Sequence, residues 1–462
     1  MTSWRDRVLE VRLGPPGHGG FCVARYEGRV VFVRHGLPGE LVAARVTEDR
    51  GGAFCRADAV EILEPSPDRV PRNCPVSGPG GAGCCDFAHA TPPAQRALKS
   101  TVVAEQLHRI TGIEREPEVE PIPGPPDAAG GWRTRIRLVV DAAGRAGVHR
   151  YRSSDVLPDL RCPQPVPGAL DGIAERRWTP GADLVIAVDD EGHRHIVELA
   201  PAPQPGQRRG AGPRDGRRGP GDRPRGVRPK PERGSSAVAG PDESLSDTPN
   251  GQRRRAVARR AAAHTARDEW VLEGTGRAVQ YVAGRRWDVS ATGFWQAHRG
   301  AAGRYSDLVA EWADLTPGAT AWDLYSGVGV FAARLAAQTG SAGAVHALES
   351  APGAVADGIA ALGDLPWLSF QSGRVERWVM GHSGPGPQVV VLDPPRAGAG
   401  KTVISAVAAA APDRIVHIGC DPASFARDLR LYLDAGYRLG ALRAFDAFPA
   451  THHVECLALL ER

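Results

Sequence analysis

Hydrophobic and polar residues follow different patterns in successive parts of the 462-residue chain. Residues 5–64 form short alternating runs separated by Gly and Pro turns, which predicts several short strands closing into a small barrel. In the segment TPPAQRALKSTVVAEQLHRITGI, residues 91–113, apolar positions recur every three or four residues, as they do in a helix. Residues 131–199 return to strand patterns, so we expect a second β-rich unit there.

From about residue 268 onward, continuous apolar strands alternate with helical segments, a pattern typical of a doubly wound parallel sheet. The predicted fold class is therefore α/β: a C-terminal Rossmann-like domain (268–462), an N-terminal barrel (1–65) and a central β-rich, cysteine-containing domain (70–200). Residues 201–262 are rich in Pro, Gly and Arg and contain few apolar side chains. We expect this segment to be a disordered insertion.

The net charge of +4 is distributed unevenly. Residues 201–260 contain 15 Arg or Lys and 6 Asp or Glu, so the rest of the chain carries a net charge of −5. Nucleic acid bound by the folded parts must therefore contact local basic patches. The basic segment itself is either a solvated spacer or a non-specific RNA contact.

The apolar runs and the cysteines indicate the cellular compartment and the redox state in which the protein works. No apolar run reaches about 18 residues and the N-terminus lacks an apolar signal segment, so we expect a cytoplasmic protein with no membrane partner. We also expect it to be a monomer. The eight cysteines, several of them clustered, favour reduced thiols, a metal site or catalysis over disulfides.

The first chemistry-bearing motif is WDLYSGVGVF, which ends a strand at Asp323 and opens a helix through a loop containing Gly327 and Gly329. Glu349 closes the next strand, where a carboxylate can accept hydrogen bonds from a ribose diol. Together these features predict a cofactor that contains adenosine. Dinucleotide-dependent enzymes use the same device, so the loop alone does not select one cofactor.

The motif VVVLDPPRAG narrows the choice of cofactor. Asp393, Pro394 and Pro395 follow an apolar strand and should lie in the crevice at the carboxyl ends of the sheet. Many S-adenosyl-L-methionine (SAM) methyltransferases that act on bases carry such a rigid loop, whereas a dehydrogenase has no need of it. The alternative interpretation is a purely structural Pro-Pro turn.

Cys420 stands at the end of the following strand, with Asp421 predicted as the N-cap and Pro422 as the first residue of a helix. A helix N-terminus favours the thiolate, which is the nucleophilic form of cysteine. Glu455, at the edge of the last apolar run, is a candidate base in the same crevice. A purely structural core cysteine is the alternative at position 420.

A thiolate, a carboxylate and a methyl donor in one crevice fit one particular reaction. Carbon 5 of uracil attacks a sulfonium methyl group poorly, but addition of a thiolate to carbon 6 makes an enolate whose carbon 5 can attack. After methyl transfer, a base must remove the carbon-5 proton so that the thiolate can leave. We assign these two tasks to Cys420 and Glu455.

The chain resembles the RNA uracil-5-methyltransferase family over nearly its whole length outside the insertion. The segment GHGGFCVARYEGRVVFVRHGLPGE is similar to a TRAM domain, a small RNA-binding barrel. CDPASFARDL and FPATHHVE are similar to the nucleophile and general-base motifs, which implies the same roles for Cys420 and Glu455. The resemblance also implies an RNA substrate, either ribosomal RNA or transfer RNA, with the affected uridine left open.

The same resemblance implies a set of SAM contacts. GFWQAH is similar to the family's F-Q-x-N segment, so Gln296 is expected to contact SAM. Asp323, Tyr325, Gly327, Glu349 and Asp393 complete the expected cofactor site. Ser326 replaces a more common cysteine in the loop and Asp421 a more common asparagine, and neither change removes a reacting group.

The family often carries four cysteines that bind a [4Fe-4S] cluster. In CPVSGPGGAGCCDFAH, Cys74 and Cys85 align with family ligands, as does the later Cys162, but Ala82 stands where another ligand is expected. The resemblance therefore implies that Cys84 is the fourth ligand. Four thiolates suffice for an iron-sulfur cluster or zinc, and unliganded thiols are the alternative.

Two other functions remain open at this stage. A methyltransferase acting on an exocyclic amine also uses a D-P-P loop but needs no nucleophilic cysteine. An RNA-binding factor with an inactive methyltransferase fold is the second alternative. The presence of both Cys420 and Glu455 argues against each.

Overall fold

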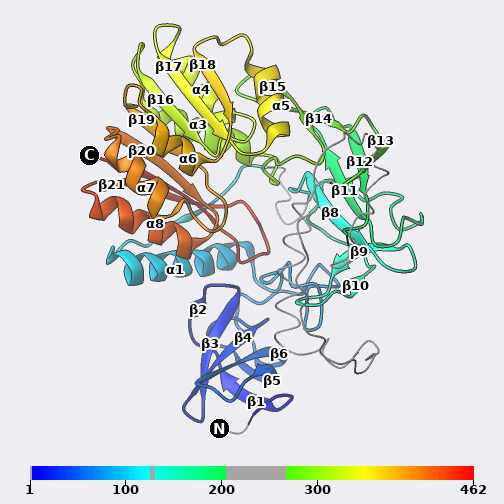
Figure 1. Ribbon diagram of the computed structural model, residues 1–462. Coiled ribbons are helices and arrows are strands. Elements are labelled where there is room, and N and C mark those ends of the chain that lie inside the picture. The colour runs from blue at the N-terminus through cyan, green and yellow to red at the C-terminus, as the bar shows by residue number, and fades with distance from the viewer. Residues whose placement is uncertain (1–2, 125–130, 204–266) are drawn as a thin grey trace, which may run out of the picture.

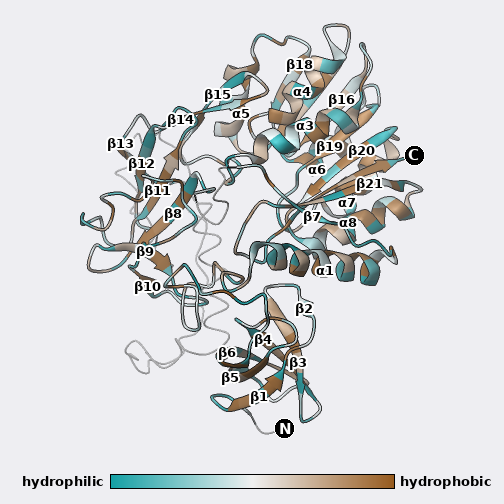
Figure 2. Cartoon of the chain, turned by 180° about the vertical axis from the view of Figure 1, so that it is seen from behind, coloured by the Kyte–Doolittle hydropathy of each residue, from teal (hydrophilic) through white to brown (hydrophobic). Residues whose placement is uncertain are grey.

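The computed structural model describes residues 3–124, 131–203 and 267–462, so nearly all of the predicted disordered insertion lies outside the described residues. Figure 1 shows a small barrel beneath helix α1 (Pro92–Thr111), with a central sheet and a larger eight-stranded sheet above it. Figure 2 shows the same three parts from behind. The predicted α/β class, with an N-terminal barrel and a doubly wound C-terminal domain, is confirmed.

The barrel is one six-stranded sheet in the order β1-β5-β6-β4-β3-β2, in which β1 also contacts β3. Side chains alternate along its strands, so that Cys22 and Val31 point into the core while Val23 and Phe32 are only half-buried on the outer face. Its strands are β1 (Val8–Arg12), β2 (Pro16–Gly17), β3 (Phe21–Tyr26), β4 (Arg29–Arg34), β5 (Leu41–Asp49) and β6 (Phe54–Glu64).

The central sheet is antiparallel throughout, in the order β10-β9-β8-β11-β12-β13. Its strands are β8 (Arg135–Val140), β9 (Ala146–His149), β10 (Val156–Leu157), β11 (Asp183–Val188), β12 (Arg194–Leu199) and β13 (Glu269–Glu273). The domain boundary that the sequence predicts at residue 268 would assign β13 to the C-terminal domain. In the structure, β13 pairs with β12 in the central sheet. Because Trp270, Val271 and Leu272 are all exposed, the strand has no alternation that could reveal its partner.

The large sheet has the order β18-β17-β16-β19-β20-β22-β21-β7. The first five strands are mutually parallel, and β22 is antiparallel to both of its neighbours. Its strands are β16 (Thr320–Leu324), β17 (Ala344–Glu349), β18 (Leu368–Ser372), β19 (Val389–Leu392), β20 (Arg414–Gly419), β21 (Arg438–Asp446), β22 (Glu455–Glu461) and β7 (Val119–Pro121). The order reverses between β16 and β19, which is where open α/β sheets bind ligands.

Helices cover both faces of this sheet, as Figure 1 shows. Along β19, Val390 and Leu392 join the core beneath α1, α6, α7 and α8, whereas Val389 and Val391 join the core beneath α3 and α4. The helices are α3 (Ala301–Ala313), α4 (Val330–Thr339), α5 (Pro352–Leu362), α6 (Val375–Gly381), α7 (Gly400–Ala409) and α8 (Pro422–Asp434). Among the described residues, none of the helices combines the length and the apolarity that crossing a membrane requires.

The sequence predicts a central domain over residues 70–200. Two elements from this range, α1 and β7, pack with the large C-terminal sheet instead of the central sheet. Helix α1 packs against α8, and β7 pairs in parallel with β21. The fully buried Lys99 donates to Asp446 Oδ1 at 2.5 Å and to the Phe448 carbonyl at 3.0 Å, which anchors α1. A three-residue strand is too short for periodicity to show its sheet.

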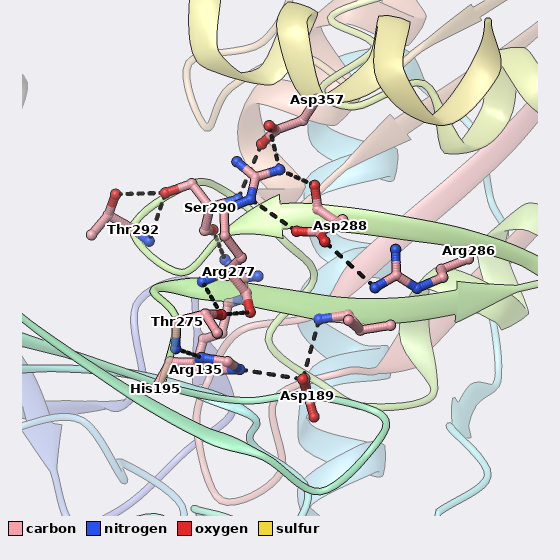
Figure 3. A network of polar contacts seen from close by, with 11 residues as sticks. Arg135, Asp189, His195, Thr275, Arg277, Arg286, Asp288, Ser290, Thr292 and Asp357 are labelled. Carbon is pink, nitrogen blue, oxygen red and sulfur yellow. Dashed lines mark hydrogen bonds and ion pairs between the residues drawn. The ribbon is translucent and has the colours of Figure 1, made fainter. Parts of the chain in front are cut away.

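The hairpin of β14 (Arg277–Val282) and β15 (Arg285–Ser290) connects the central sheet to the large one. Figure 3 shows its polar contacts: the Arg277 guanidinium pairs with Asp357 at 2.9 Å, and the Ser290 backbone N–H donates to the same carboxylate at 3.0 Å. On the other side, the buried Arg135 donates to the carbonyls of Ser290 at 3.1 Å and Gly293 at 2.5 Å. These bonds fix the segment that leads to Gln296.

Candidate active site

Cys420 and Glu455 lie opposite each other at the end of two paired strands. In the antiparallel register of β20 and β22, Gly419 faces Cys456, so the next residue on each strand brings Cys420 level with Glu455. Glu455 is 3% exposed, whereas Cys420 is only partly buried. Asp393 follows the neighbouring strand β19 and reaches the same edge. The structure therefore brings a thiol and two carboxyl groups together.

The electrostatics of this site favour neutral groups in the absence of a ligand. Burial, reinforced by the Glu455 carboxyl, raises the pKa of the Cys420 thiol to about 12. Burial and the nearby Asp393 raise the pKa of Glu455 well above its ordinary value, and burial raises the pKa of Asp393 to about 7. The tendency of a helix N-terminus to favour the thiolate is outweighed here by the loss of water around the sulfur.

Arg396, which directly follows the D-P-P motif, supplies the opposing positive charge. Its guanidinium lowers the pKa of both Cys420 and Glu455 against the effect of burial. Its NH2 group lies 2.9 Å from His453 Nδ1, and because arginine can only donate, the histidine nitrogen accepts. Burial lowers the pKa of His453 to about 3, which keeps the ring neutral and able to accept. The sequence interpretation missed Arg396, although its place in D-P-P-R was a usable signal.

The predicted N-cap of α8 is confirmed. The Asp421 side chain accepts hydrogen bonds from the backbone N–H groups of Ala423 at 3.1 Å and Ser424 at 3.0 Å, and Pro422 occupies the first turn. A contact that the sequence did not reveal comes from the barrel, where His18 Nε2 lies 3.1 Å from Asp421 Oδ2. Although burial opposes it, the hydrogen bond with His18 holds the pKa of Asp421 below its usual range.

The glycine loop after β16 has the shape expected of a nucleoside-binding turn. Tyr325, Gly327 and Gly329 have φ angles of 63°, 55° and 81°, so the backbone coils closely at the strand end. The Gly327 N–H donates to Glu349 Oε2 at 3.1 Å, which joins the loop to the end of β17. These residues therefore form one connected group at the point where the strand order reverses.

Unsatisfied polar atoms in this loop fit a bound ligand. Asp323 is fully buried and accepts from the Ala332 N–H through Oδ2 at 2.8 Å, while its Oδ1 has no partner among the described residues. Burial raises the pKa of Asp323 to about 8. The Ser326 hydroxyl is buried and also lacks a partner in the described part of the chain. A nucleoside, whose hydroxyl groups and ring nitrogens both donate and accept hydrogen bonds, has the chemistry to pair with a carboxyl group and a hydroxyl.

Gln296 is half-buried in the segment between β15 and α3, which Arg135 holds in place. Helix α3 packs against α4, the helix that the glycine loop opens. Within the described residues, no hydrogen bond links the Gln296 side chain to the glycine loop. The packing of α3 against α4 supports a position of Gln296 near the cofactor site. A contact between Gln296 and SAM stays a prediction.

The four cysteines of the predicted cluster gather in one place. The sulfurs of Cys84 and Cys85 are 3.9 Å apart, and Cys74 shares a hydrogen bond with Cys85. Burial, with a further contribution from Cys74 and Cys84, raises the pKa of Cys162 to about 11. Gln164 Nε2 donates to the Cys85 sulfur at 3.1 Å.

Their arrangement nevertheless does not support the predicted [4Fe-4S] cluster. In residues 3–124, 131–203 and 267–462, no three or more His, Cys, Asp or Glu side chains are grouped so that they could hold a metal ion. The adjacent Cys84 and Cys85 differ in environment, since Cys84 is exposed and Cys85 is 1% exposed. With Ala82 where the resemblance expects a ligand, the cluster would need both of these neighbouring residues as ligands.

The N-terminal and C-terminal parts of the chain each match a known protein family. Residues 5–60 match the TRAM domain family, and residues 387–462 match the family described as tRNA (Uracil-5-)-methyltransferase. An RNA methyltransferase of Corynebacterium glutamicum is 37% identical over 98% of this chain and 97% of its own. One of Streptomyces avermitilis is 40% identical over 98% of both chains.

Two further matches span the full length. The 23S rRNA (uracil(1939)-C(5))-methyltransferase RlmD of Alkalilimnicola ehrlichii is 28% identical over 98% of this chain and 96% of its own. The structure of the Pyrococcus abyssi tRNA (uracil-54, C5)-methyltransferase with S-adenosyl-L-homocysteine has a TM-score of 0.63 and 19% identity, covering 98% of this chain and 100% of that one. The latter similarity concerns the fold.

Proposed function

The chain belongs to the RNA uracil-5-methyltransferase family, and on that premise we propose that it methylates carbon 5 of a uridine in RNA through a covalent adduct with Cys420. The family makes it an RNA methyltransferase that uses SAM. SAM supplies a methyl group on a positively charged sulfonium. The observation that carries the proposal is the placement of Cys420 opposite Glu455 at the ends of β20 and β22.

Cys420, Glu455 and Arg396 have separate roles in the proposed reaction. The Cys420 thiol loses its proton to water, a step that Arg396 assists by lowering the pKa of the thiol, and the resulting thiolate adds to carbon 6 of the base and makes an enolate. Carbon 5 then takes the methyl group. Glu455 as a carboxylate removes the proton from carbon 5, and the Cys420 sulfur leaves. Arg396 also lowers the pKa of Glu455, which favours the carboxylate that this last step requires.

Ribosomal RNA is the substrate that the relatives favour. The relative named as a 23S rRNA uracil methyltransferase matches over almost the whole length of both chains. We propose a uridine in 23S rRNA as the target. Transfer RNA is the alternative, which the matching family description for residues 387–462 supports.

Methyl transfer to defined RNA tests the proposed function. The purified protein is incubated with SAM and with ribosomal or transfer RNA that lacks 5-methyluridine, and the digested RNA is examined by mass spectrometry. We expect 5-methyluridine at one position of 23S rRNA. Methylation of an exocyclic amine would identify the rival enzyme class, and RNA binding without transfer would identify an inactive binding factor.

Glu349 provides a test of the proposed SAM site. Glu349→Ala removes the carboxylate that we expect to accept from the ribose hydroxyls of SAM and that also accepts from the Gly327 N–H, so we expect SAM affinity to fall by about 1–3 kcal/mol. Isothermal titration calorimetry measures the change, and Asp434→Ala at the exposed end of α8 serves as the control. Unchanged affinity in Glu349→Ala would remove this residue from the cofactor site.

The [4Fe-4S] cluster stays a prediction that rests on the resemblance to the family and not on the arrangement of the four cysteines. Iron and sulfide analysis of protein purified without oxygen tests it. If the cluster forms, iron is expected in the wild type and in Cys55→Ser, a control cysteine in the barrel core, and is expected to be lost in Cys162→Ser. A wild type without iron would establish these cysteines as unliganded thiols.

A further inference from the structure

Three phenylalanines form a continuous row on the outer face of the barrel. The ring centroids of Phe21 and Phe32 are 4.7 Å apart, and those of Phe32 and Phe54 are 5.5 Å apart. The Arg56 guanidinium carbon lies 6.0, 5.6 and 5.9 Å from the three centroids. We call Phe21, Phe32 and Phe54 the aromatic row.

The aromatic row is a surface and not part of the barrel core. Phe32 on β4 is level with Arg56 on the parallel strand β6, and their neighbours Val33 and Cys55 point inward. Phe54 is 50% exposed. The barrel core does not need these rings, because it is filled by the alternate side chains of the same strands.

One end of the row meets the catalytic domain. Phe21 begins β3 directly after Gly20, whose position for a Cβ lies 3.2 Å from the His452 Cβ and 3.0 Å from the Asp86 Cβ. Three residues before Phe21, the His18 ring contacts Asp421, the residue next to Cys420. The Phe21 end of the aromatic row is therefore joined, through three residues of backbone, to a contact with the residue next to the nucleophile.

Ion pairs hold this end of the barrel in place. Asp86 accepts from Arg34 of β4, and its other oxygen lies 2.6 Å from Nδ1 of His452, which belongs to the loop before Glu455. The Arg34 guanidinium also stacks 3.7 Å from the Tyr151 ring centroid of the central domain. The distance between row and nucleophile is thus fixed by contacts to both other parts of the protein.

The chemistry of the row fits unpaired nucleobases. Aromatic rings stack on the faces of any base in a single strand, and a neighbouring guanidinium can stack or pair with a phosphate. The Arg56 guanidinium is held near the rings by Glu48, 3.6 Å away. A strand whose target uridine enters the crevice at Cys420 would lead its neighbouring nucleotides past His18 and onto these rings.

We infer that the aromatic row binds unpaired nucleotides of the RNA substrate next to the target uridine, and this inference rests on the proposed function. The row recognises single-stranded RNA by stacking and sets how far the strand extends from the catalytic crevice. It takes no part in the bond-making steps. Phe54, the most exposed ring, contributes to binding and not to turnover.

Substitutions of Phe54 test the inference. Phe54→Ala and Phe54→Leu are expected to weaken binding of a single-stranded RNA about 5- to 100-fold, because an aliphatic side chain offers no face for stacking. Phe54→Tyr keeps the ring and is expected to bind like the wild type. Fluorescence anisotropy at constant salt measures the affinities, and Trp270→Ala, an exposed ring on the central sheet, is the control.

Kinetics with substrate RNA separate binding from catalysis. In Phe54→Ala we expect KM to rise by a similar factor while kcat and the melting temperature stay at the wild-type values. Wild-type affinity in Phe54→Ala would overturn the inference and favour a protein partner for the row. Wild-type affinity in Phe54→Leu would equally overturn it, since apolar bulk alone would then suffice.

Failure of the inference about the aromatic row can be distinguished from failure of the proposed function. RNA affinity is measured without methyl transfer, so a wild type that makes no 5-methyluridine still shows whether Phe54→Ala weakens binding. Conversely, a protein that forms 5-methyluridine with wild-type KM in Phe54→Ala would retain the proposed function and refute the role of the row.

Discussion

Cys420→Ala is expected to abolish methyl transfer to RNA and to leave SAM binding intact. Addition of the sulfur to carbon 6 precedes methyl transfer in the proposed scheme, so without it carbon 5 is too weak a nucleophile and no later step can begin. Because Cys420 is only partly buried and its side chain is small, the substitution should not disturb the fold. The assay measures labelled methyl incorporation into RNA, alongside calorimetry with SAM.

RNA containing 5-fluorouridine gives the same prediction a second readout. Fluorine at carbon 5 cannot be removed as a proton, so the wild type should form a stable complex with this RNA that survives denaturation. Cys420→Ala should form none, whereas Cys55→Ala, altered in the barrel core, should form it as the wild type does. A Cys420→Ala variant that still makes 5-methyluridine would refute covalent catalysis.

Glu455→Gln is expected to let methyl transfer occur and then to trap the product. The glutamine side chain fills the same buried space but cannot accept the carbon-5 proton, so the sulfur cannot leave. Methylated RNA should accumulate on Cys420 as a slowly migrating band on a denaturing gel, with multiple turnover reduced by about 10²-fold or more.

A matched control is Glu461→Gln at the other end of β22, which should turn over normally. Mass spectrometry of the trapped species should find one methyl group and one RNA per protein. Normal turnover in Glu455→Gln would assign the proton transfer to another group, with Asp393 at the same sheet edge the next to examine.

The placement of the candidate site was largely predictable from the sequence, because the carboxyl ends of parallel strands meet at one edge of a sheet. Asp393, Cys420 and Glu349 each stand at the end of an apolar run, and the structure places each beside a strand end at that edge. The N-cap at Asp421 was predictable for a similar reason, since capping depends on neighbouring residues only.

Contacts between distant parts of the chain were not predictable in this way. His18 meets Asp421 across 403 residues of sequence, and Asp86 meets His452 across 366. Neither pair has a local pattern, because each depends on how the barrel docks against the catalytic domain. The sign of the pKa shift at Cys420 also required the structure, since burial and the Glu455 carboxyl outweigh the helix N-terminus.

The sheets that β7 and β13 join could not be predicted for a different physical reason. Strand β7 is three residues long and the first four residues of β13 are all exposed, so neither has a periodicity that reveals its sheet. Pairing of β7 with β21 and of β13 with β12 is decided by backbone hydrogen bonds between strands far apart in the sequence.

The anchoring of α1 has a consequence for biosynthesis. Lys99 and Asp446 are separated by 347 residues, so at the usual rates of translation α1 leaves the ribosome roughly 20–70 s before its partner strand is made. During that interval Val103 and Leu107 have no large sheet to cover them. The apolar side chains of α1 therefore gain their native cover only near the end of synthesis, so folding of this part of the protein has to wait for the C-terminal strands.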